Sequence, residues 1–192
     1  MREIEVRRHS HAVPGNPGQV RHLSQKGVTL ARRVGETMGP FALVVTSELP
    51  RTFETALAMG FAVNAQDDAF NRFSGGDHVR DIAAEVALEA SFGEFAEAVR
   101  RGGPTAQFAK QQLSALQKIL DRLSEGDRAL VVTHGAFIQP GAVGLLPDAD
   151  HLSWGGPCRL CEGYLVTFEN NDPIRIEIIR LPEDLARDAI RD

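Results

Sequence analysis

Apolar and polar positions follow one another in blocks along the chain, and each block predicts one element. Ile4 and Val6 alternate with charged residues, which predicts a first strand. Residues 41–46 (FALVVT) and 129–133 (ALVVT) are continuous apolar runs, typical of strands buried on both faces of a parallel sheet. Residues 163–169 and 174–181 predict two closing strands joined by residues 170–173, and residues 62–69 predict a further short one.

Helical stretches separate these strands. Ser24 is a candidate N-cap for a helix reaching about Gly39, and Pro50 opens a second helix ending near Gly60. Further helices are predicted over residues 77–101, 105–124 and 135–146 and in the C-terminal PEDLARDAIRD. Strands alternating with helices predict an α/β fold of three layers, α/β/α, with a mostly parallel central sheet. We expect a single domain over residues 1–192, with a helical insertion at about residues 70–127.

Composition and charge narrow the class of function. The chain is 43% apolar and 24% charged, which is typical of a soluble globular protein. Its formal net charge of −5 argues against a general nucleic-acid binder. No run of about 18 apolar residues suggests a membrane span, and the charged N-terminus lacks the apolar core of a signal peptide. We therefore expect a cytoplasmic protein with no nucleic-acid or membrane partner, and the sequence leaves its oligomeric state open.

The cysteines and three of the histidines predict little chemistry. Cys158 and Cys161 form a CRLC segment that we expect to be a strand, with the two thiols facing opposite ways. No second CxxC or HxxxH pattern completes a zinc site, so we expect ordinary reduced, partly buried cysteines. His22, His78 and His151 are expected to be exposed.

Polar residues gather where three predicted strands end. The first strand ends at Arg8-His9, the second is followed by Ser47 and Arg51, and a later one by His134. Ligands of open α/β sheets bind at the carboxyl ends of strands, so these residues should share one site. Arginine grips phosphate oxygens with two parallel bonds, and a neutral imidazole is a competent nucleophile toward phosphorus. The cluster therefore predicts phosphoryl chemistry.

These motifs, taken in order, resemble the histidine phosphatase superfamily, whose best-known fold is that of phosphoglycerate mutase. The family's Arg-His-Gly corresponds to residues 8–10 (RHS), and its Ser-x-x-x-Arg-x-x-x-Thr to residues 47–55 (SELPRTFET). Its later His-Gly corresponds to residues 134–135, and its Leu-Thr-x-x-Gly helix start to residues 23–27 (LSQKG). The agreement in order and spacing runs over about residues 4–145. Residues 8–12 (RHSHA) and 21–24 (RHLS) are most similar to the small phosphohistidine phosphatases.

The resemblance implies a role for each site residue. His9 would be a nucleophile that is transiently phosphorylated, and Arg8, Arg51 and His134 would form the phosphate pocket with no metal or organic cofactor. The further candidates for phosphate or substrate contacts are Arg21, Ser47, Ser10 and Gly135. Ser47 is equally suited to cap the helix that follows it. The implied activity is hydrolysis of a phosphomonoester or a phosphohistidine, carried by a phosphorylated small molecule or a phosphoprotein.

Two departures from the family pattern concern the chemistry. Ser10 stands where the family has glycine beside the nucleophile, and Arg72 stands where many members carry a glutamate acid. Asp77 and Glu85 are candidate general acids, together with Glu89. A chain without an acid would favour a good leaving group, such as an imidazole, over an alkyl oxygen that needs a proton. The same departure argues against a mutase.

Two alternative functions are weighed against a phosphatase. A catalytically weak or inactive module of the same fold would bind phosphate without turnover. A metal-dependent hydrolase would use His9 and His11, because His-x-His after a first strand also occurs in amidohydrolases. That barrel usually needs about 250 residues, and its further ligands are not evident in this chain. Otherwise we expect His11 at the rim of the substrate site and Arg7 in solvent.

Overall fold

A mostly parallel sheet forms the middle of the protein, for which a computed structural model describes residues 1–15, 20–71 and 78–189. The strands are β1 (Arg2–Arg8), β2 (Leu43–Thr46), β3 (Ala65–Gln66), β4 (Arg128–Thr133), β5 (Gly163–Glu169) and β6 (Asp172–Ile179). Their order across the sheet is β3-β2-β4-β1-β5-β6. The pairs β1–β4, β2–β4 and β2–β3 are parallel, whereas β5 runs antiparallel to both β1 and β6. The predicted α/β sheet is confirmed.

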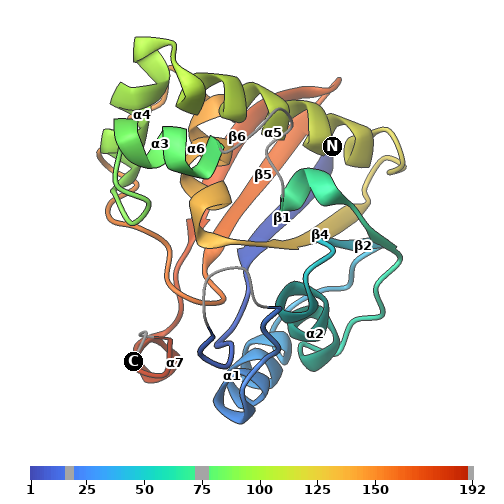
Figure 1. Cartoon of the computed structure of the whole chain (residues 1–192). Coiled ribbons are helices and arrows are strands. Elements are labelled where there is room, and N and C mark those ends of the chain that lie inside the picture. The colour runs from blue at the N-terminus through green and yellow to red at the C-terminus, as the bar shows by residue number, and fades with distance from the viewer. Residues whose placement is uncertain (16–19, 72–77, 190–192) are drawn as a thin grey trace.

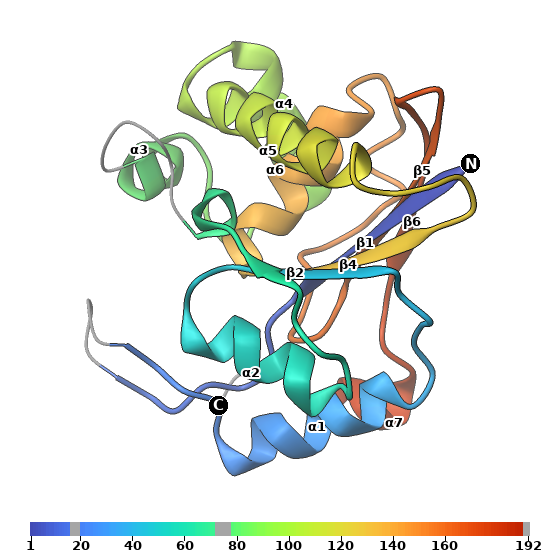
Figure 2. The same ribbon diagram turned by 90° about the vertical axis from the view of Figure 1, so that its right-hand side faces the viewer.

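Helices cover both faces of this sheet. They are α1 (Gln25–Gly35), α2 (Pro50–Ala58), α3 (His78–Glu85), α4 (Phe92–Arg101), α5 (Pro104–Leu120), α6 (Gly135–Leu145) and α7 (Glu183–Ala186). Figure 1 shows the sheet running between the two helical layers. In the rotated view of Figure 2, helices α3 to α6 lie on one side of the sheet and α1, α2 and α7 on the other. This is the expected three-layer arrangement.

The central strands contribute side chains to the cores on both faces of the sheet, because successive residues of a strand point to opposite faces. Val45 and Val131 belong to the large core cluster that also holds aromatic side chains of α4, α5 and α6. Their neighbours Val44 and Leu130 instead pack with Ala56 of α2. Burial of apolar surface on both faces is the main favourable contribution to this fold.

The register of the parallel strands places their carboxyl ends at one edge of the sheet. Arg8 at the end of β1 pairs with Thr133 at the end of β4. Thr46 at the end of β2 pairs with Val132, one residue earlier in β4. Residues that follow these three strands therefore begin side by side, as the sequence predicted.

The helical stretch predicted over residues 77–101 is two helices, α3 and α4, with residues 86–91 between them. Ser91 begins α4 through a capping box: its hydroxyl accepts from the Glu94 amide at 3.3 Å, and the Glu94 carboxylate accepts from the Ser91 amide at 2.8 Å. In this motif two backbone amides that have no acceptor inside the helix, those of Ser91 and Glu94, each gain one. The predicted first helix also ends earlier, at Gly35.

The CRLC segment, predicted as a strand, is a turn. Cys161 has a positive φ of 61°, which a strand does not allow. Both cysteines are free and buried. Cys158 packs in the large core cluster, whereas Cys161 packs with Leu30 of α1, so the two thiols belong to different clusters. Burial raises the pKa of Cys158 to about 12 and that of Cys161 to about 11, so both stay protonated near neutral pH.

Two residues expected in solvent are buried. Arg7 donates to the carboxylate of Glu5 at 2.5 Å and to the carbonyl of Cys161 at 2.9 Å, so its charge is paired inside the sheet. The ring of His151 lies 2.9 Å from the Leu146 carbonyl through Nε2 and packs edge-on against Trp154. Both predictions were wrong: Arg7 is paired within its own strand and with the distant Cys161, and His151 folds onto neighbours in its own loop. The side chain of His78 lies outside the described residues.

Candidate active site

The ends of β1, β2 and β4 bring together the residues predicted for the site. His9 follows β1, Ser47 follows β2 and His134 follows β4, where it stands at the start of α6. Arg51 lies in the first turn of α2, which begins at Pro50. The rings of His9 and His134 meet edge-on with centroids 5.3 Å apart. The two imidazoles therefore border one space, with the arginine beside them.

His9 is held in one tautomer. Its Nδ1 lies 2.7 Å from the carbonyl oxygen of Ser10, which can only accept, so Nδ1 carries the hydrogen. Nε2 accepts from the Nε–H of Arg51 at 3.2 Å. Burial lowers the pKa of His9 from 6.5 to about 3, although the bond to Ser10 opposes the shift and the charge of Arg51 adds to it. His9 is therefore a neutral imidazole whose unprotonated nitrogen faces a guanidinium.

His134 is neutral as well. Its Nε2 lies 3.0 Å from the hydroxyl of Ser47, and its buried Nδ1 has no hydrogen-bond partner among the described residues. Burial lowers the pKa of His134 well below 6.5, and the neighbouring His9 and Arg51 lower it further. Ser47 does not cap α2, since Leu49 occupies the N-cap position without a side-chain bond. The Ser47 hydroxyl nevertheless accepts from the Leu49 amide at 3.3 Å and lies 2.8 Å from Oγ1 of Thr52, so it links the start of α2 to His134.

Three arginines place positive charge on the site: Arg8, which pairs with Glu89, and the two arginines Arg21 and Arg51. Burial lowers the pKa of Arg51 from 12.5 to about 10, and the charge of Arg21 lowers it further. Arg21 lowers the pKa of both site histidines as well, so its charge acts on the same space. Within the described part of the chain, no carboxylate forms an ion pair with either arginine. Two neighbouring positive charges without a counter-ion favour a bound anion.

Arg8 reaches past the start of α6 to the other side of the site. Its Nη1 donates to the Cys158 carbonyl at 2.7 Å, and its Nη2 lies 3.3 Å from Oε1 of Glu89. A Cβ added to Gly135 would lie 2.8 Å from the Arg8 guanidinium carbon. A side chain at position 135 would push this guanidinium away, so we interpret the role of Gly135 as one of close approach.

Ser10 does not present its hydroxyl to the site. The side chain is fully buried, and the hydroxyl donates to the Gly27 carbonyl of α1 at 2.8 Å. Its amide donates to Oγ1 of Thr55 in α2 at 3.0 Å. The predicted phosphate contact by Ser10 therefore needs correction, because both groups already bind helices. Sequence reasoning assigned no role to this use of Thr55, although the residue lies in the motif of residues 47–55.

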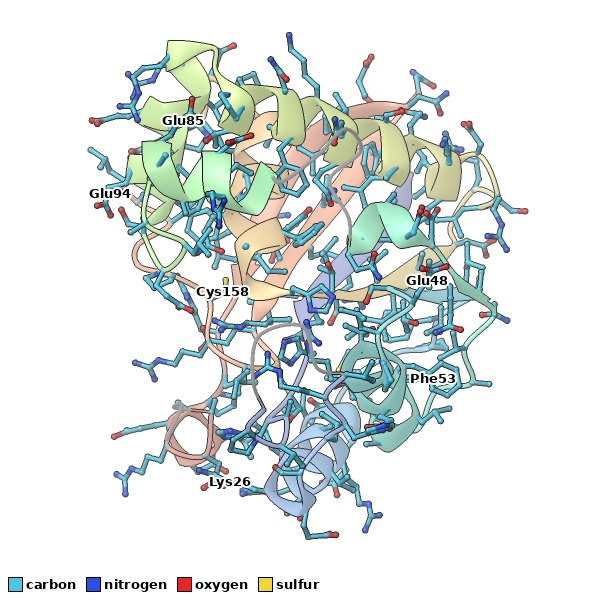
Figure 3. All side chains as sticks on the ribbon, in the orientation of Figure 1. Lys26, Glu48, Phe53, Glu85, Glu94 and Cys158 are labelled. Carbon is cyan, nitrogen blue, oxygen red and sulfur yellow. The ribbon has the colours of Figure 1, made fainter. Side chains whose placement is uncertain are left out.

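The candidate acids fall in different places. Asp77 and Arg72 lie outside the described residues. Glu85 accepts from the amide of Thr105 at 2.9 Å and so caps the start of α5. Figure 3 shows Glu85 among the helices far from Cys158, whose carbonyl binds Arg8. Glu89 is the carboxylate that contacts a predicted site residue, and it replaces Glu85 as the acid to consider.

The pair of histidines required by the metal-dependent alternative does not converge. His9 uses Nδ1 on the Ser10 carbonyl, whereas Nε2 of His11 lies 2.6 Å from the Asp188 carbonyl. Among the described residues, no three His, Cys, Asp or Glu side chains are grouped so as to hold a metal ion. His11 is buried under the C-terminal segment instead of forming an open rim. Among all the residues that the structure describes, no helix is long and apolar enough to cross a bilayer.

Comparison with known proteins relates most of the chain to one family. The profile of the histidine phosphatase superfamily (branch 1) matches residues 19–176. No curated protein sequence matches the chain significantly.

Several solved structures share the fold. Phosphoserine phosphatase from Entamoeba histolytica, solved with 3-phosphoglyceric acid, is 16% identical with a TM-score of 0.69, over 96% of this chain and 100% of that one. A mycobacterial glucosyl-3-phosphoglycerate phosphatase is 18% identical with a TM-score of 0.64, over 92% and 96%. The protein YhfR of Bacillus stearothermophilus is 22% identical with a TM-score of 0.64, over 91% and 95%. At such identities these structures establish a common fold.

Proposed function

The chain belongs to the histidine phosphatase superfamily, and we propose that it is a phosphatase that transfers a phosphoryl group to His9 before water releases it. The observation that carries the proposal is the state of His9. The imidazole is neutral, Nδ1 is fixed on a carbonyl, and Nε2 faces Arg51. A fixed nitrogen lone pair beside positive charge is suited to attack phosphorus, since phosphoryl transfer depends on positioning and charge stabilisation.

The proposed reaction has two steps. In the first, the Nε2 lone pair of His9 attacks phosphorus while the bond between phosphorus and the leaving oxygen breaks. Arg51 and Arg21 offset the negative charge of the phosphoryl oxygens, and the N–H of the neutral His134 or the hydroxyl of its neighbour Ser47 donates a hydrogen bond to one of them. In the second step, water attacks the phosphohistidine, the bond between nitrogen and phosphorus breaks, and inorganic phosphate leaves. The lone pair returns to Nε2, which completes the cycle.

Glu89 is the acid and base that we assign to these steps. It contacts Arg8, the last residue of the strand that precedes the nucleophile, and its side chain is 54% exposed, so it can exchange protons with water. In its protonated form it would give the leaving oxygen a proton in the first step. As a carboxylate it would take a proton from water in the second. Its presence keeps alkyl phosphates within the range of substrates.

A phosphomonoester of a small molecule is the substrate class that we favour. The phosphatases with similar structures are named for phosphoserine and for glucosyl-3-phosphoglycerate, both small phosphate esters. A phosphohistidine remains the second candidate because its imidazole leaving group makes little demand on an acid.

The test is hydrolysis of p-nitrophenyl phosphate in the presence of a chelator. We expect the wild type to turn over and His9→Ala to lose at least about 10³-fold in rate, a typical cost of removing a nucleophile. Arg51→Ala should lower the rate and weaken phosphate binding together, while Arg175→Ala serves as the matched control, since Arg175 is exposed and pairs with Glu177. Phosphate binding without turnover in the wild type would make the chain a binding module. Wild-type activity in His9→Ala would overturn the mechanism.

A further inference from the structure

The C-terminal segment, residues 183–189, folds back onto α1. Arg33 of α1 forms ion pairs with Asp184 at 3.0 Å and with Asp188 at 3.1 Å. Figures 1 and 2 both show α7 beside α1 on the lower side of the sheet. The segment therefore has a defined position near the loop that carries the nucleophile, although it is far from that loop in sequence.

Its last described residues contact this loop directly. His11, two residues after His9, binds the carbonyl of Asp188 through Nε2 at 2.6 Å. Ala189 is only 2% exposed and packs with Leu30 and Leu160. The backbone at residues 188–189 is thus held from both sides, by a hydrogen bond and by apolar contact.

Ala189 also lines a cavity beside Arg8. The cavity has a volume of about 160 Å³ and is lined by Arg8, Glu89, Pro157, Cys158, Arg159, Leu160 and Ala189. Its lining combines the ion pair of Arg8 with Glu89 and apolar residues, among them Leu160 and Ala189. The C-terminal segment is therefore a wall of the cavity that contains the proposed acid.

We propose that this cavity holds the leaving group of the substrate, and that the C-terminal segment limits the size of that group. The inference rests on the proposed function, because a leaving oxygen must lie within hydrogen-bond reach of its acid, here Glu89. An engineered cavity of about 150 Å³ in another protein holds one benzene ring. A leaving group the size of one ring should therefore fit, whereas a two-ring group should meet the wall at Ala189.

Binding of non-hydrolysable phosphonates tests the proposal without relying on turnover. The affinities of inorganic phosphate, phenylphosphonate and 1-naphthylphosphonate would be measured by calorimetry for four proteins. These are the wild type, a chain ending at Arg187, Ala189→Leu and the control Arg187→Ala. The control lies in the same segment, but Arg187 is 79% exposed and pairs only with the exposed Glu183 among the described residues. Thermal melting would establish that each variant is folded.

We expect the wild type and the control to bind the phenyl compound at least about tenfold more tightly than the naphthyl compound. The shortened chain should reduce this preference to about threefold or less, and Ala189→Leu should weaken phenylphosphonate binding while leaving inorganic phosphate unchanged. Equal preference in all four proteins, or a parallel loss of inorganic phosphate affinity, would overturn the proposal. A protein that shows the expected preferences but does not hydrolyse phosphate esters would contradict the proposed function alone.

Discussion

At the scale of single residues, burial decides the protonation of the site. His9 and His134 are enclosed by protein and surrounded by arginine charge, so both have lowered pKa values and stay neutral. A neutral His9 is a nucleophile without prior deprotonation, and this is why no general base is needed to activate it. The cost of holding neutral histidines among arginines should appear in the stability of the protein at acid pH.

This cost gives a prediction for stability. The unfolded chain protonates His9 below about pH 6.5, whereas the folded protein does so only near pH 3. The free energy of unfolding should therefore fall as the pH drops through this window, by about 1.4 kcal/mol per pH unit for each such histidine. Urea unfolding in phosphate-free buffer between about pH 7 and pH 4 would measure the slope. In His9→Gln the dependence of the unfolding free energy on pH should be weaker than in the wild type, by the contribution of one proton. Identical slopes in the two proteins would contradict the lowered pKa of His9.

The assignment of Glu89 predicts a dependence on the leaving group. Glu89→Gln should slow alkyl phosphates by about 10²- to 10⁴-fold, because their leaving oxygen needs a proton, and slow p-nitrophenyl phosphate much less. Glu85→Gln is the matched control, since Glu85 binds Thr105 at the start of α5. Rates for a series of esters would be plotted against the pKa of the leaving alcohol. Equal losses for every ester in Glu89→Gln would remove Glu89 from the role of acid.

The sequence could predict which residues reach the site better than what their side chains do there. Arg8 ends one strand, and His9 and His134 follow strands whose parallel register is set by apolar runs, so their meeting follows from the backbone. The uses of Ser10 and Glu85 depend on partners in distant segments, Gly27 and Thr105. Such contacts leave no local signal in the chain.

At the scale of elements, the start of α6 is where the sheet and the site meet. Gly135 is its first residue, and a Cβ there would lie 2.8 Å from the guanidinium carbon of Arg8. The glycine lets the Arg8 guanidinium come close to the backbone of α6. Because Gly135 directly follows His134, the start of this one helix positions both Arg8 and His134.

A substitution at this helix end should therefore act on the site more than on the fold. Gly135→Ala should displace Arg8 and lower kcat/KM by about 10- to 100-fold, as small displacements of positioning groups do. Gly156→Ala is a suitable control, because no atom lies within 4 Å of its added Cβ. Steady-state kinetics and thermal melting would be compared for the two variants. An unchanged kcat/KM in Gly135→Ala would show that the path of Arg8 is not required.

Apolar patterning predicted the elements more reliably than their ends. The runs at residues 41–46 and 129–133 contain the buried parts of β2 (Leu43–Thr46) and β4 (Arg128–Thr133), because every position of each run except its last threonine is apolar. The break at residues 86–91 depends on a capping box at Ser91, whose Ser-x-x-Glu pattern is a short signal beside a longer helical periodicity. The turn at Cys161 has no such signal, because only its positive φ distinguishes it from a strand.

At the scale of the whole molecule, the phosphate site and the cavity beside it draw on different parts of the chain. The strand ends and α2 supply His9, Arg51 and His134, whereas the cavity draws on Glu89, residues 157–160 and Ala189. These segments are far apart in the sequence and meet only in the folded protein, so the sequence did not reveal that the C-terminal segment contacts His11. On this account the sheet provides the chemistry and the surrounding segments provide the selectivity.

The most direct test of the central claim is a rapid-quench reaction with a radiolabelled aryl phosphate. A good leaving group makes the first step independent of the acid, so the phosphoenzyme should form even if Glu89 is misassigned. The account predicts a protein-bound phosphate that is labile in acid, maps to His9, decays as inorganic phosphate is released, and is absent from His9→Ala. Turnover without any phosphoenzyme, or a phosphoenzyme that persists in His9→Ala, would contradict it.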